Sequence, residues 1–203
     1  IARLLRNKIE NELGLRVVLT RTTDTTVAMD ERAAIANNNR ADLFISLHCN
    51  AGLRRAAGGI EVYFLSDAKT TEAAAVAERE NAALEFEADS QEDEAAETTL
   101  RGIARSILSS LYLKESQGLA ASVRSSMAQR FKTLDDRGVK QANFYVMRGT
   151  GGAMPSILVE MGFISNPKEE KRLRTERFQK DMADAIFKGI RSFKETHEKQ
   201  LSD

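Results

Sequence analysis

The feature that most constrains the fold is a set of short apolar runs that alternate with segments of helical spacing. Residues 42–45 lead an apolar run towards His48, and residues 60–65 (IEVYFL) follow after a loop rich in glycine and alanine. Both runs have the length and the side chains of buried strands. A strand is also predicted at residues 16–21 and a helix from about residue 27 to 39. The order strand, helix, strand, loop, strand is typical of an α/β layer fold.

The second half of the chain continues with mostly helical spacing. Alanine and glutamate favour a helix over residues 69–86, and apolar stripes predict two more helices, over residues 100–111 and 119–131. Asn166 and Pro167 provide the N-cap and the first position of a further helix, with an acidic residue at the third position. This C-terminal part is predicted to be helical to about residue 199.

Two more strands are predicted in this half. Residues 139–147 contain the aromatic pair Phe144 and Tyr145, which favours a strand. A glycine-rich loop then precedes the apolar run 156–159, which ends at Glu160. The loop lacks the Lys-Ser/Thr of a phosphate-binding loop, so a nucleotide site is not indicated.

Composition sets limits on the class of protein. A chain of 203 residues with 42% hydrophobic side chains can bury one core and does not require a second domain. Thirty basic and thirty acidic residues cancel, so no overall field favours nucleic acid or an anionic membrane surface. No apolar stretch reaches the ~20 residues of a membrane span, and none of the 203 residues shows the pattern expected of a signal peptide.

The sequence begins inside a helical pattern. Leu5, Ile9 and Leu13 form one apolar stripe, which Gly14 is placed to end, and no initiator methionine precedes Ile1. We therefore expect a fragment of a longer chain.

Two ionisable residues at strand ends are the candidates for chemistry. His48 stands at the carboxyl end of one predicted strand and Glu160 at the end of another, the places where an open α/β sheet carries its active site. Each has a structural alternative, because His48 could be a hydrogen-bonded core histidine and Glu160 could form a buried ion pair. The other histidine, His197, lies in a charged helical segment. Together the strand-end residues suggest a metallohydrolase.

The single cysteine, Cys49, excludes an internal disulfide. Its position directly after a predicted strand favours a small core residue over a nucleophile or a metal thiolate.

Six motifs resemble, in order, those of the zinc-dependent N-acetylmuramoyl-L-alanine amidases. They are residues 20–24 (TRTTD), Glu31 and Arg32 with Ala36 and Asn37, and residues 41–51 (ADLFISLHCNA), 59–63 (GIEVY), 137–142 (RGVKQA) and 159–166 (VEMGFISN). Each motif alone is weakly specific, whereas six at compatible spacing over nearly the whole chain are not expected by chance.

The resemblance implies both a fold and a reaction. The fold is a single α/β domain over residues 1–203, with a mostly parallel central sheet flanked by helices. The reaction is the zinc-dependent hydrolysis of the amide between the lactyl group of N-acetylmuramic acid and L-alanine, which removes stem peptides from peptidoglycan. By the same resemblance His48 is a zinc ligand and Glu160 is the catalytic carboxylate.

The family's other two zinc ligands have no counterpart in the sequence. They are a histidine in an Asp-Pro-Gly-His-Gly-like turn and a glutamate shortly before the helix with which the chain begins. We expect both to lie upstream of Ile1, and we expect the chain as it stands to bind Zn²⁺ weakly or not at all.

Residues 69–113 are a candidate regulatory segment. Residues 87–97 carry six acidic side chains and no basic one, and a solvated surface insertion is the simplest explanation. However, division-associated members of the resembled family carry a helical insertion here, which covers the cleft until an activator protein displaces it. The stretch from Glu78 to Glu97 occupies the matching place, and a carboxylate from it could compete with substrate for the metal.

The expected partners are thus peptidoglycan and an activator protein that acts on residues 69–113. No nucleic-acid partner is expected. The substrate implies a periplasmic or extracellular location. Two other functions are compatible with the residues: another zinc hydrolase, such as a carboxypeptidase or deacetylase, and a non-catalytic wall-binding or regulatory module.

Overall fold

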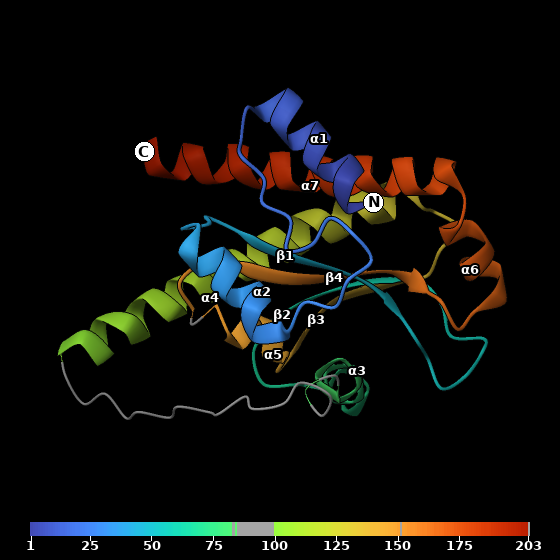
Figure 1. The fold of residues 1–203 in the computed structure, drawn as a ribbon, viewed down its shortest axis with the longest axis horizontal. Coiled ribbons are helices and arrows are strands. Elements are labelled where there is room, and N and C mark those ends of the chain that lie inside the picture. Colours follow the sequence, from blue (N-terminus) through green and yellow to red (C-terminus); the bar gives the residue numbers. More distant parts are fainter. Residues whose placement is uncertain (83, 85–99, 151, 203) are drawn as a thin grey trace.

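A four-stranded sheet forms the centre of the computed structural model, which describes residues 1–82, 84, 100–150 and 152–202 (Figure 1). The strands occur in the order β1-β4-β2-β3. Their bounds are Phe44–Asn50 for β1, Ile60–Leu65 for β2, Asp136–Ala142 for β3 and Ser156–Phe163 for β4. The β1–β4 and β2–β3 pairs are parallel and the β2–β4 pair is antiparallel. The predicted α/β domain with a mostly parallel sheet is therefore confirmed.

Helices cover both faces of the sheet. They are α1 (Ala2–Leu13), α2 (Met29–Asn38), α3 (Thr71–Asn81), α4 (Leu100–Arg130), α5 (Tyr145–Arg148), α6 (Pro167–Leu173) and α7 (Glu176–Ser202). Side chains of α1, α4 and α7 pack with Ile60, Val62 and Val159 in the larger hydrophobic cluster. Side chains of α2, α3 and α5 pack with Tyr63 and Leu158 in the smaller one. Because strand side chains alternate between faces, α3 lies over the opposite face from α7, as Figure 1 shows.

Several helix ends follow the sequence signals. Gly14 ends α1 in the left-handed conformation, with φ of 65°. The Asn166 side chain accepts hydrogen bonds from the N–H groups of Lys168 and Glu169 at the start of α6. Glu169 departs from the expected capping role, because its carboxylate accepts the N–H groups of Gly59 and Phe163 at 2.8 and 2.7 Å. It thereby ties α6 to the ends of β2 and β4.

The predicted strand at residues 16–21 is wrong. This segment has no strand pairing among the described residues and lines, with β1, a cavity of about 670 Å³. β-forming side chains make a strand only where a neighbouring strand supplies hydrogen bonds, and here none of the described strands pairs with the segment.

One further strand prediction and two helical predictions also need adjustment. The expected strand 139–147 ends at Ala142, and Phe144 precedes the short helix α5. Phe144 is fully buried with its ring against Tyr63 at a centroid distance of 5.0 Å, so its aromatic character serves the core. The two helices predicted over residues 100–131 are one continuous helix, α4, and the helix predicted over residues 69–86 ends at Asn81. The acidic stretch 87–97 lies outside the described residues.

None of the described helices combines the length and the apolar character needed to cross a membrane.

Candidate metal centre

His48 and Glu160 are direct neighbours across two parallel strands. They are register partners in the β1–β4 pair, so the sheet itself places both side chains in the carboxyl-terminal halves of adjacent strands. The sequence predicted each residue at a strand end, and the pairing of β1 with β4 brings them together. Because β2 and β3 run antiparallel to β4, they contribute their amino-terminal residues to the same edge.

Glu160 is a buried carboxyl group without a hydrogen-bond partner among the described residues. Its exposed fraction is 0%, and neither Oε1 nor Oε2 is satisfied. Burial, followed by the nearby charges of Glu80 and Glu61, raises the pKa of Glu160 to about 9. A buried carboxyl group left in this condition is costly, which points to a ligand or a proton as its missing partner.

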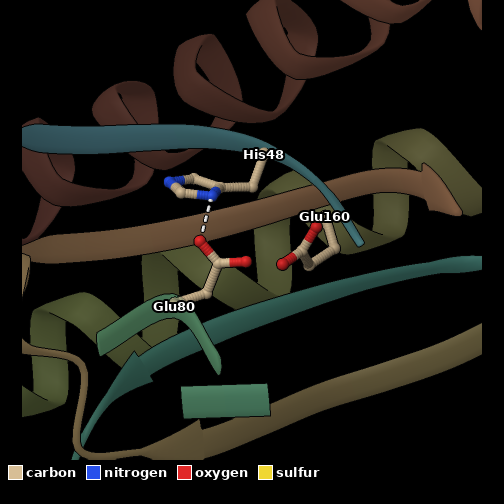
Figure 2. Close-up of side chains that lie close together, drawn as sticks. All are labelled: His48, Glu80 and Glu160. Carbon is tan, nitrogen blue, oxygen red and sulfur yellow. Dashed lines mark ion pairs between the residues drawn. The ribbon is translucent and has the colours of Figure 1, made fainter. Parts of the chain in front are cut away.

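A third side chain reaches the site from α3. Glu80 Oε2 lies 2.6 Å from His48 Nδ1, and Figure 2 shows Glu80 and Glu160 approaching each other from opposite elements beside the imidazole. The preceding residue, Arg79, donates to the carbonyl of Ala51 and, at 3.4 Å, to Asn50 Oδ1. Helix α3 is thus held over the carboxyl end of β1 by two consecutive residues.

The second nitrogen of His48 is also engaged. Nε2 lies 2.9 Å from Ser46 Oγ, two residues earlier on the same face of β1. Such a contact fixes the ring orientation and leaves Nδ1 directed at the two carboxylates.

These three residues fit a divalent metal. Among the described residues, His48, Glu80 and Glu160 form a group whose ligand atoms all lie within 4.8 Å of one another. One imidazole nitrogen and carboxylate oxygens are a donor set that Zn²⁺ accepts. The unsatisfied oxygens of Glu160 are consistent with a cation at this point. The sequence indicated that a carboxylate from the stretch beginning at Glu78 could reach the metal, but it did not single out Glu80.

A fully satisfied carboxylate, Glu61, lies next to the centre and was missed as a site residue. It is the register partner of Glu160 across the β2–β4 pair and is 1% exposed. Arg137 Nε and Lys140 Nζ donate to its Oε2 at 3.0 and 2.7 Å. These cations outweigh burial, the largest single effect, and hold the pKa of Glu61 below its ordinary value. The signal was present in the sequence, since Glu61, Arg137 and Lys140 all stand in the family motifs.

The remaining candidates lie elsewhere. His197 stacks on Phe193 within α7, at a ring distance of 5.8 Å, and is not part of this group. Cys49 is partly buried against the larger hydrophobic cluster, and burial raises the pKa of its thiol. Both facts agree with the core role predicted for Cys49.

Comparison with known proteins identifies the family. The family model described as N-acetylmuramoyl-L-alanine amidase matches residues 1–192. This chain belongs to that family. Among the amidases it is 34% identical, over 196 residues, to AmiC of Escherichia coli O6:H1, and 32% identical, over 195 residues, to AmiA of Escherichia coli K12. Each alignment covers 95% of this chain, but only 45% of AmiC and 65% of AmiA.

Solved amidase structures have the same fold. The N-acetylmuramoyl-L-alanine amidase of Clostridium difficile 630 is 29% identical with a TM-score of 0.68, covering 96% of this chain and 80% of that one. The catalytic domain of the amidase CwlV from Bacillus (Paenibacillus) polymyxa var. colistinus is 27% identical with a TM-score of 0.67 and the same coverage. The resemblance noted in the sequence is therefore confirmed.

Proposed function

We propose that this chain is the catalytic domain of a zinc-dependent peptidoglycan hydrolase that cleaves the amide between the lactyl group of N-acetylmuramic acid and L-alanine. The observation that carries the proposal is the juxtaposition of His48 with the unsatisfied, buried Glu160 on two adjacent parallel strands. Family membership supplies the reaction class. The cell wall is then the place of action, in a periplasmic or extracellular compartment.

In this proposal each residue has a distinct task. Zn²⁺, when bound, supplies Lewis acidity at the scissile carbonyl. His48 would hold the metal through Nδ1, while Ser46 fixes the orientation of the ring. Glu160 accepts a proton from the attacking water and returns it to the leaving amine. Burial raises the pKa of Glu160 to about 9 in the absence of a metal. A cation held next to Glu160 would lower this pKa towards the working pH, where the carboxylate can both accept and return a proton.

Glu80 would inhibit the reaction in this scheme. Its carboxylate contacts the same imidazole nitrogen that the metal requires, so it occupies space that water and substrate need. We propose that the segment over residues 69–113 restrains the site in this way, and that an activator protein releases it. The support comes from the described helix α3, because residues 83 and 85–99 of the segment lie outside the described part.

Digestion of purified peptidoglycan in the presence of Zn²⁺ tests the activity. In the full-length protein, which would supply the two expected upstream ligands, the domain, and more strongly its Glu80→Ala variant, should release stem peptides that carry a free L-alanine amine and should leave the glycan intact. Glu160→Gln should lower the rate by roughly 10²- to 10⁴-fold, the usual contribution of general acid–base catalysis. Cleavage within the peptide, or deacetylation of the sugar, would indicate another zinc hydrolase. No release by Glu80→Ala would favour a non-catalytic module.

A further inference from the structure

A second carboxylate of α3 is bound next to the metal centre. Glu72, in the first turn of α3, contacts two cationic residues of β3: its Oε1 accepts from Arg137 Nη2, and its Oε2 lies 3.3 Å from Lys140 Nζ. Each oxygen of one carboxylate thus meets a different cation. Such paired, charge-assisted contacts are how proteins recognise carboxylate groups.

Glu61 neutralises only one of the two positive charges of Arg137 and Lys140. Glu61 already receives four donors, because Asn50 and Tyr63 bind its Oε1 and Arg137 and Lys140 bind its Oε2. Two positive charges face one negative charge at Glu61, so one positive charge remains. Glu72 balances that charge in the structure.

Glu61 and Glu72 differ in how firmly they are held. The Glu61 side chain is 1% exposed and belongs to β2, in the middle of the sheet. The Glu72 side chain is 58% exposed and belongs to the helix that carries Glu80. The buried side chains of α3 are the small residues Ala73, Val76 and Ala77, which bury little apolar surface. If α3 moves away from the sheet, Glu61 keeps its position in β2, and the donors of Arg137 and Lys140 that Glu72 now occupies become accessible to another carboxylate.

The guanidinium of Arg137 is also oriented independently of α3. Its Cζ lies 5.3 Å from the ring centroid of Phe163, at the end of β4. This cation–π contact and the Nε bond to Glu61 hold the group in position. The donor that Glu72 now uses would therefore remain directed at the same point.

We propose that Arg137 and Lys140 form a subsite for a carboxylate of the stem peptide, and that Glu72 occupies this subsite in place of substrate. The inference rests on the proposed amidase function. Glu72 and Glu80 are eight residues apart, or about 12 Å along a helix, which matches three to four residues of extended peptide. The recognised carboxylate is thus expected near the third or fourth residue of the stem peptide.

Binding of two matched ligands tests the subsite without turnover. One is an N-acetylmuramoyl tripeptide with a free terminal carboxylate, and the other is the same tripeptide as its terminal amide, with all other carboxylates amidated in both. Calorimetry is done on the Glu160→Gln chain, which removes hydrolysis. Adding Glu72→Gln should tighten binding of the free acid by about 3- to 10-fold, typical of a partly exposed charge pair, and should leave the amide unchanged.

Control variants separate this effect from a general change in charge. Glu78→Gln removes the same charge from an exposed position of α3 and should not alter the ratio of the two affinities. In the Glu72→Gln background, Lys140→Gln should abolish the preference for the free acid, and Lys140→Arg should retain it. Thermal unfolding of each variant verifies that the chain is folded.

The proposal is overturned if the Glu72→Gln chain binds both ligands equally or binds neither, or if Glu78→Gln has the same effect as Glu72→Gln. Because the measurement is of binding, its failure is distinct from a failure of the amidase function. If peptide is released but the free acid and the amide bind with equal affinity, the subsite proposal is wrong and the amidase function stands. If the free acid binds more tightly but no peptide is released, the subsite proposal stands and the proposed amidase function is wrong.

Discussion

Glu80 Oε2 lies 2.6 Å from His48 Nδ1, which joins a residue of α3 to the strand that carries the candidate metal centre. With Glu72 bound by Arg137 and Lys140, α3 is attached to the functional edge of the sheet near both of its ends. Both attachments are polar and partly exposed, and such contacts stabilise weakly. In the proposed regulation, a partner with higher affinity for a form in which α3 has moved away would therefore shift the equilibrium at modest cost.

Removing the Glu80 carboxylate should increase activity. Glu80→Ala opens the position next to His48 Nδ1, so we expect peptidoglycan hydrolysis to rise by about 10-fold, the change that corresponds to ~1.4 kcal/mol of lost restraint. Release of soluble peptide at fixed Zn²⁺ concentration measures this. Glu78→Ala, on the exposed side of the same helix, should have no effect. An equal or lower rate for Glu80→Ala would mean that Glu80 supports the site and does not block it.

Removing His48 should reduce bound metal more than stability. Its side chain is 22% exposed, so His48→Ala should fold, whereas Zn²⁺ affinity should fall because a ligand is lost. Ser46→Ala removes only the group that orients the ring, and we expect it to weaken Zn²⁺ binding by about 10-fold, the lower end of such effects. Competition with a metal-sensitive dye gives both affinities. An unchanged Zn²⁺ affinity in His48→Ala would show that His48 is not a metal ligand and is instead a hydrogen-bonded core histidine.

The sequence predicted the two strand-end residues because their signals are local. An apolar run that ends in His48, and another that ends in Glu160, can be recognised without knowledge of the fold. Parallel pairing of β1 with β4 then places the residues side by side. The role of Glu61 was not predicted, because its partners Arg137 and Lys140 are 76 and 79 residues away and meet it only through the β2–β3 pair.

The errors in secondary structure have a related cause. Residues 16–21 contain good strand formers, but the described sheet offers them no partner strand. Phe144 has a high strand propensity, yet it fills the core beside Tyr63 just after β3 has ended. In both places tertiary contacts, which a local pattern does not contain, decide the conformation.

The crossing of α4 and α7 depends on one glycine. A Cβ at Gly189 would lie 2.5 Å from Val123 Cα, a backbone contact that cannot relax easily. Gly189→Ala should therefore lower the free energy of unfolding by about 1–3 kcal/mol despite its higher helix propensity. Gly118→Ala in α4 is the matched control, because its Cβ would meet only the Phe193 side chain at 3.5 Å. Urea unfolding should show the first variant destabilised and the second unchanged or slightly stabilised; similar values would exclude close packing at Gly189.

The metal-free protein should lose stability as the pH rises. The pKa of Glu160 is about 9 in the folded chain, against an ordinary value of 4.5. Between these values the folded state keeps a proton that the unfolded chain has released. The free energy of unfolding therefore decreases with increasing pH across this window.

Glu160→Gln isolates this contribution, because the amide stays neutral at every pH. In chelator-treated protein, we expect the variant to gain stability relative to wild type between pH 5 and pH 9, by an amount of order a few kcal/mol. Other ionisable groups titrate in both proteins and cancel in the difference. Saturating Zn²⁺ should reduce the gap, since a cation beside Glu160 stabilises its charged form. Parallel stability curves for the two metal-free proteins would show that Glu160 is already ionised in the folded state, with a partner that compensates for its burial.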